Sequence, residues 1–181
     1  MTNRTRGTML NCTIVCVACL CFVAAVGGQT ADWKSYSYPT EGFQASYPSM
    51  PALEKKAVDT QAGTFELRSY VVEAGDVALF IGICDFGKKA PETDPDAMLQ
   101  GAKNGVLLNS NSHLTREQKI TFGTYHGLAF EAESESTHVS ARFYMAGTTL
   151  YQTLVVYPLS KPYDQTAKFL DSFQLITRTS N

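Results

Sequence analysis

The sequence carries no marked excess of charge of either sign. Its 181 residues include 15 Lys and Arg against 17 Asp and Glu, a formal net charge of −2, and 44% of the residues are hydrophobic. A hydrophobic share of this size predicts a folded chain rather than a disordered one. Dedicated nucleic-acid binders show a basic surplus or a clustered basic face, so the charge balance argues against nucleic acid as a partner.

Long apolar runs are also missing, except for one near the N-terminus. Arg4 and Arg6 precede the apolar segment 12–26, which is followed by Gly27 and Gly28. A positive start, an apolar middle and small residues at the end are typical of a secretory signal peptide, here residues 1–28. The apolar segment is shorter than the roughly 20 residues of a permanent membrane helix. We therefore expect an extracytoplasmic protein, periplasmic or secreted, that touches a membrane only if the signal stays uncleaved.

Cysteine becomes scarce once this segment is removed. Four of the five cysteines lie within residues 1–28, which leaves Cys84 alone in residues 29–181. One cysteine forms neither an internal disulfide nor a cysteine-rich metal site. Residues 29–181 are therefore predicted to form a single domain that its hydrophobic core stabilises. Cys84 lies inside an apolar run, which predicts a buried and unreactive thiol.

Known catalytic motifs are absent from the sequence. It contains no Gly-x-Ser-x-Gly, no His-Glu-x-x-His and no glycine-rich phosphate loop. Such motifs place a nucleophile, a metal or a phosphate group in a defined local geometry. We therefore expect no enzyme activity and no cofactor.

The residues that are present predict an α+β fold with helices packed on a largely antiparallel sheet. Asp94 and Pro95 mark the start of a helix that ends at 109–111, and 162–173 is predicted as a second helix. The run 77–86 is apolar on both alternating faces, as in a central strand that is covered on both sides. The other predicted strands are 33–38, 43–47, 57–60, 64–73, 117–122, 128–135, 138–145, 149–157 and 174–177.

Several of these segments resemble the PsbP-like superfamily. They are the opening Tyr-Pro-Thr-Glu-Gly-Phe-Gln-Ala-Ser-Tyr-Pro-Ser at 38–49, the strand at 150–155 and the closing Phe-Leu-Asp-Ser-Phe-Gln-Leu at 169–175. Between them, 94–106 and 120–127 look like secreted bacterial members of that superfamily, which also shares its fold with a Ran-binding import factor. The resemblance implies an α/β/α sandwich that works by binding larger partners. It carries no photosynthetic function and no known site residue onto this chain.

The most distinctive local feature of the sequence is a segment with a glutamate at every second position. Glu131, Glu133 and Glu135 would share one face of a strand, with His138 shortly after them and His126 in a preceding turn. These residues could form a metal-binding module or an enzyme site, the alternative to a binding domain. Carboxylates two residues apart on a strand are about 7 Å from each other, however, so one ion would also need ligands from a neighbouring strand. A solvated acidic face is the simpler interpretation.

Tyrosines gather in the late strands, at Tyr144, Tyr151 and Tyr157. Cross-strand aromatic packing would account for them, and an exposed tyrosine patch would instead be a docking surface. Together with the family resemblance, this predicts a non-enzymatic binding or assembly domain. Its expected partner is an envelope protein or a secreted protein.

Overall fold

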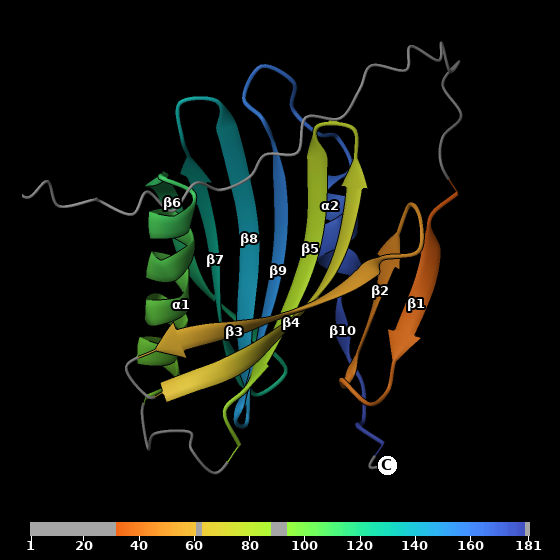
Figure 1. The fold of residues 1–181 in the computed structure, drawn as a ribbon, viewed down its shortest axis with the longest axis vertical. Helices are drawn as coiled ribbons and strands as arrows, with labels where there is room; N and C mark the ends of the chain where they lie inside the picture. The colour runs from red at the N-terminus through yellow and green to blue at the C-terminus, as the bar shows by residue number, and fades with distance from the viewer. Residues whose placement is uncertain (1–31, 61–62, 88–93, 180–181) are drawn as a thin grey trace, which may run out of the picture. The chain divides into compact units, whose positions relative to one another are not determined.

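The structure is a computed structural model that describes residues 32–60, 63–87 and 94–179. The chain divides into Met1–Thr30 and Ala31–Asn181, and only the second unit is described below. The predicted signal peptide, 1–28, lies outside the described residues. The elements, in chain order, are β1 (Lys34–Tyr38), β2 (Phe43–Tyr47), β3 (Ala52–Thr60), β4 (Gly63–Ala74), β5 (Val77–Asp85), α1 (Pro95–Asn109), β6 (His113–Phe122), β7 (Tyr125–Glu133), β8 (Thr137–Ala146), β9 (Thr149–Pro158), α2 (Thr166–Ser172) and β10 (Gln174–Leu175) (Figure 1).

The strands form two sheets. Seven of them follow the order β3-β4-β5-β9-β8-β7-β6, and β1, β2 and β10 form a separate small sheet. Every pairing in both sheets is antiparallel. The expected α+β class with a largely antiparallel sheet is therefore confirmed.

Strand β5 lies inside the large sheet, between β4 and β9. Leu79, Ile81 and Ile83 are fully buried on one face, and Cys84 is buried on the other. An apolar strand that packs on both faces needs cover from both sides. The prediction of a central, doubly covered strand at 77–86 is confirmed.

Helix α1 covers one face of the large sheet, called here the α1 face. The Asp94 side chain accepts a hydrogen bond from the backbone N–H of Asp96 at 3.0 Å, and Pro95 occupies the first turn. Leu99 of the helix is buried in a core that includes Phe130 and Phe143. The amphipathic spacing of the helix thus directs its apolar side toward the sheet.

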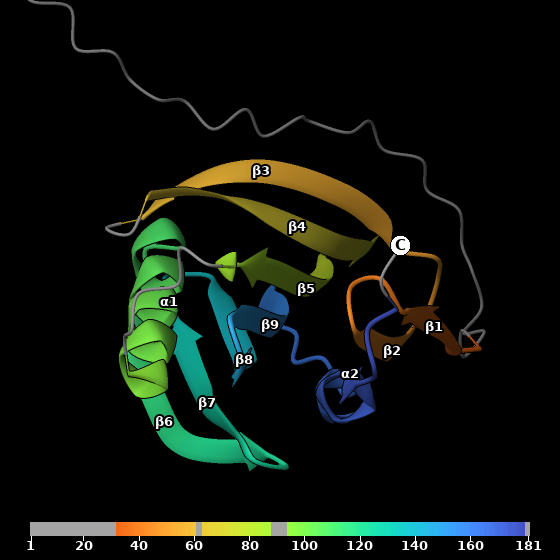
Figure 2. The same ribbon diagram turned by 90° about the horizontal axis from the view of Figure 1, so that it is seen from below.

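The opposite face, called here the α2 face, packs against α2 and the small sheet. Phe169 of α2 and Phe173, which follows the helix, share a core with Phe43 and Tyr47 of β2. Figure 2 shows α1 and α2 on opposite sides of β8 and β9. This is the α/β/α arrangement that the family resemblance implied. None of the helices in the described part of the chain is long and apolar enough to span a bilayer.

Several element boundaries differ from the prediction. The strand predicted at 128–135 is β7, Tyr125–Glu133, because a tight turn at Gly123 and Thr124 leads directly into it. Gly123 has a φ of +58°, a left-handed conformation that glycine adopts without steric cost. His126 therefore lies in a strand rather than in a turn. Strand β6 also starts four residues earlier than predicted, and α2 is shorter than the predicted 162–173.

Candidate functional site

The strand register arranges side chains of the α2 face in rows that run across β9, β8, β7 and β6. Directly paired residues point to the same face, so each row brings together side chains that are far apart in the sequence. Three successive rows are Tyr151–Tyr144–Gly127–Ile120, Thr153–Arg142–Ala129–Gln118 and Val155–Ser140–Glu131–Arg116. The face thus changes from apolar in the first row to polar in the third.

A groove of about 640 Å³ lies over these rows and beside α2. We call it the α2 groove. Strands β6, β7 and β8 form its floor and, along β6, one wall; Asp164, Thr166, Ala167 and Leu170 form the opposite wall. Figure 2 shows the elements that bound it, β6 and β7 on one side and α2 on the other. Its volume falls within the range of about 300–1,000 Å³ that is usual for ligand sites.

Gly127 shapes the apolar end of the groove. A Cβ atom at this position would lie 2.7 Å from the Tyr144 ring and 3.0 Å from the Ile120 side chain. The missing side chain therefore lets Tyr144 and Ile120 approach each other over β7. Because a larger residue would push them apart, Gly127 determines the form of this end of the groove.

An ion pair ties the floor of the groove to α2. Arg142 Nη1 of β8 lies 2.6 Å from Asp171 Oδ1 of the helix. The pair fixes α2 beside the middle row of the face. At the apolar end, the Phe173 ring stacks on Tyr144 with centroids 5.7 Å apart. The helix therefore runs along the groove, with its start near the polar row and its end near the apolar row.

Glu131 is held toward β8 rather than β6. Its Oε1 accepts a hydrogen bond from Ser140 Oγ at 2.9 Å, and its Oε2 lies 2.7 Å from His138 Nε2. Both carboxylate oxygens are therefore engaged on that side. The side chain of Arg116, the neighbour of Glu131 on β6, forms no hydrogen bond or ion pair within the described residues, and neither does the side chain of Asp164 on the far wall.

His138 lies between two carboxylates. Its Nδ1 is 3.2 Å from Glu133 Oε1, its Nε2 faces Glu131, and its ring stacks on Tyr157 with centroids 4.9 Å apart. Burial, reinforced by the charges of the two glutamates, raises the pKa of Tyr157.

The structure does not assemble the rest of the predicted acidic site. Strand β7 ends at Glu133, so Glu135 lies exposed in the turn that follows instead of sharing the strand face. His126 lies on the α1 face, where its Nδ1 is 2.9 Å from Asp96 Oδ1. No group of three His, Cys, Asp or Glu side chains suited to hold a metal ion occurs in the ranges that the structure covers. The metal or enzyme alternative is therefore not favoured.

Two of the three tyrosines predicted as a possible docking surface are core residues. Tyr144 is 6% exposed and Tyr151 is 3% exposed, and the Tyr151 hydroxyl donates to the Glu41 carbonyl oxygen at 2.7 Å. The prediction of an exposed patch is therefore wrong for these two. Tyr157 is half-buried against His138.

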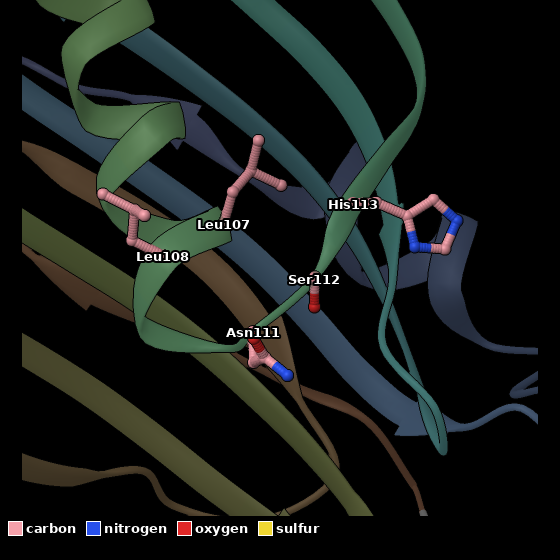
Figure 3. Close-up of a pocket in the computed structure, with 5 residues that line it drawn as sticks. All are labelled: Leu107, Leu108, Asn111, Ser112 and His113. Carbon is pink, nitrogen blue, oxygen red and sulfur yellow. The ribbon is translucent and has the colours of Figure 1, made fainter.

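A second, smaller hollow of about 320 Å³ lies where α1 leads into β6. Figure 3 shows its side chains pointing in different directions, with the His113 ring turned away from Leu107 and Leu108. Leu108 is 82% exposed. Because its polar groups do not converge on one point, this hollow is a weaker candidate than the α2 groove.

No protein-family model and no curated protein sequence matches this chain. Among solved structures, it is similar to the solution structure of cyanobacterial PsbP (CyanoP) from Synechocystis sp. PCC 6803. The similarity has a TM-score of 0.52 at 14% sequence identity and covers 84% of this chain and 98% of the other. The chain has a PsbP-like fold.

On this PsbP-like fold, Arg116 and Asp164 of the groove were not predicted from the sequence. Arg116 precedes the predicted strand 117–122, whereas the structure begins β6 at His113. A longer strand prediction would have shown Arg116, Gln118 and Ile120 on one face, because alternate residues share a face. No sequence pattern indicates that Asp164 lies across from them, since that depends on where α2 packs.

Proposed function

We propose that the protein acts outside the cytoplasm as a non-catalytic binding domain, and that its α2 groove receives an extended segment of another extracytoplasmic protein. The observation that carries this proposal is the groove itself. Its opposite walls present a guanidinium, Arg116, and a carboxylate, Asp164, that form no hydrogen bond or ion pair within the described residues. At its apolar end, the partly buried Ile120 is available for contact, above the buried Leu170. Interfaces that bind polypeptides combine apolar contact with polar groups of this kind.

The position of the groove beside β6 supports a polypeptide as the ligand. Strand β6 is the last strand of the large sheet, and no described strand pairs with its outer side. A strand edge presents main-chain N–H and C=O groups that a bound segment can use. A small molecule would not need them.

The side chains around the groove support binding rather than catalysis. The Ser140 hydroxyl donates to Glu131, and His138 faces two carboxylates instead of Ser140. These three residues therefore lack the order of nucleophile, base and orienting group that acyl transfer needs. Burial raises the pKa of Cys84 to about 11, which keeps its thiol protonated.

The extracytoplasmic part of the proposal rests on the residue pattern of 1–28. Fractionation of the producing cells, followed by N-terminal sequencing of the protein, tests it. We expect an extracytoplasmic chain that starts at Gln29. A cytoplasmic chain that keeps residues 1–28 would contradict this part.

Site-specific photo-cross-linking in the producing cells tests the binding site. A photoreactive amino acid replaces Gln118 at the groove rim. In a matched control it replaces Glu73, an exposed residue of β4 whose side chain forms no hydrogen bond or ion pair within the described residues. We expect a discrete protein adduct at position 118 and none at position 73. Ala167→Trp, which fills the groove from the exposed side of α2, should abolish the adduct. Equal adducts at both positions, or an adduct that A167W leaves unchanged, would contradict the proposal.

A further inference from the structure

We propose that the α2 groove selects a segment with an acidic residue directly next to a basic residue, which Arg116 and Asp164 bind from opposite walls. This inference rests on the proposed function and names the chemistry of the ligand. Arg116 lies on β6 in the polar row, and Asp164 lies just before α2. The start of α2 is beside that same polar row, because Asp171, later in the helix, contacts Arg142 of the next row and Phe173 contacts Tyr144 of the row beyond. These two charges, which have no ion-pair partner in the part of the chain that the structure covers, thus flank one end of the groove.

The contacts of Glu131 keep Arg116 available. As a direct neighbour across the strand pair, Glu131 would otherwise be the natural partner of Arg116. Instead, Ser140 and His138 bind its two oxygens from the side of β8. Among the described residues that line the groove, the other guanidinium is that of Arg142, and it is already paired with Asp171. An incoming carboxylate therefore has one free guanidinium to bind.

The geometry of an extended chain explains why the acidic residue and the basic residue of the bound segment are neighbours in its sequence. Successive side chains of an extended segment point in opposite directions. A segment that runs along the groove between β6 and α2 therefore directs one side chain to Arg116 and the next to Asp164. Charge complementarity makes the first acidic and the second basic. Ile120 lies four residues further along β6, so an apolar side chain about 13 Å along the segment meets the apolar end of the groove.

Selection of peptides from a random phage-displayed decapeptide library tests the inference. The purified protein is the bait, and selected peptides are retained if A167W loses them. We expect these peptides to share an adjacent acidic–basic pair. Arg116→Glu and Asp164→Lys should each weaken their binding at least about tenfold, which is about 1.4 kcal/mol. The matched control is Lys56→Glu, the same reversal at an exposed residue of β3 that has no ion pair within the described part of the chain, and it should leave the affinity unchanged.

The double variant R116E/D164K gives the most specific test of this inference. It should bind synthetic peptides in which the two charges are exchanged and should reject the original peptides, because both walls are reversed together. Two results would overturn this inference and leave the proposed function standing. In the first, the peptides that A167W loses lack the adjacent charge pair. In the second, these peptides bind R116E as tightly as they bind the parent protein. If no peptide is selected, or if A167W retains every selected peptide, both proposals fail.

Discussion

Gly42 lies at a point where the backbone and two side chains meet. Its φ is +79°, and a Cβ atom there would lie 2.7 Å from Arg178 Cγ and 2.9 Å from the Tyr151 hydroxyl. We expect Gly42→Ala to destabilise the protein by about 1–3 kcal/mol, because a left-handed backbone strains alanine and the new methyl group displaces both neighbours. Urea unfolding followed by circular dichroism measures the change.

Gly75→Ala is the matched control for this prediction. Gly75 has a similar φ of +66°, and a Cβ atom there would meet no other atom within 4 Å. Gly75→Ala should therefore lower the free energy of unfolding only by the amount that the left-handed backbone costs alanine. Equal losses in the two variants would mean that the contacts with Arg178 and Tyr151 contribute nothing at Gly42.

The reaction of Cys84 with a thiol reagent tests whether its side chain is buried. Cys84 is the only cysteine in residues 29–181, and burial raises the pKa of its thiol to about 11. At pH 8 the native chain from residue 29 onward should not react with a thiol reagent, because the thiol is both protonated and inaccessible. Unfolding in guanidinium chloride should release one reactive thiol per chain. Rapid reaction of the native protein would show that β5 opens to solvent.

Single residues show where the sequence was informative. The apolar surroundings of Cys84 predicted its burial, and the structure leaves it 7% exposed. Tyr144 and Tyr151 were ambiguous, because alternation shows that two residues share a face but not that α2 covers that face. Glu135 was misplaced because the end of β7 depends on the turn after it.

Among the elements, α1 and β6 are joined by a buried lysine. Lys103 of α1 is 7% exposed and pairs with Glu117 of β6. The hydrogen bond from Lys103 holds the pKa of Glu117 below its ordinary value. Glu117→Gln should therefore destabilise the protein at pH 7 by about 1–3 kcal/mol, because the buried ammonium group loses its charged acceptor.

The pH dependence of this loss has a definite sign. A carboxylate whose folded pKa is lowered stabilises the protein above its ordinary pKa of 4.5, and this contribution disappears as the pH falls through the lowered value. The difference between the parent and E117Q should therefore shrink on acidification below about pH 4.5. Urea titrations across this range measure it, with Glu73→Gln on the exposed surface as the control. A difference that stays constant with pH would contradict the pairing.

Elements were predicted better than their arrangement. Strand β5 was recognisable because both of its faces are apolar, and α1 was recognisable from its N-terminal Asp94 and Pro95. The α2 groove was not, because it needs β6, β7 and α2 to meet through contacts between residues far apart in the chain. Local patterns describe which face of an element is apolar, and they do not state which other element covers it.

For the whole molecule, the order of the strands predicts a gradient of protection. Strand β5 is paired on both sides and buried, whereas β3 pairs with β4 alone among the described strands and is largely exposed. Native-state hydrogen exchange followed by mass spectrometry should find the slowest amides in peptides from β5 and β9 and much faster exchange in β3. Equal protection in β3 and β5 would mean that another surface covers the outer edge of β3.

The pairing of β10 with β2 also has a consequence for the timing of folding. Gln44 and Gln174 face each other in the small sheet although 130 residues separate them. At usual rates of synthesis, β2 leaves the ribosome roughly 7–26 s before β10 does. Until then, the β2 side chain Phe43 has no Phe173 to pack against. The small sheet, and the part of the core that Phe43 and Phe173 share, can therefore close only after almost the whole chain has been made.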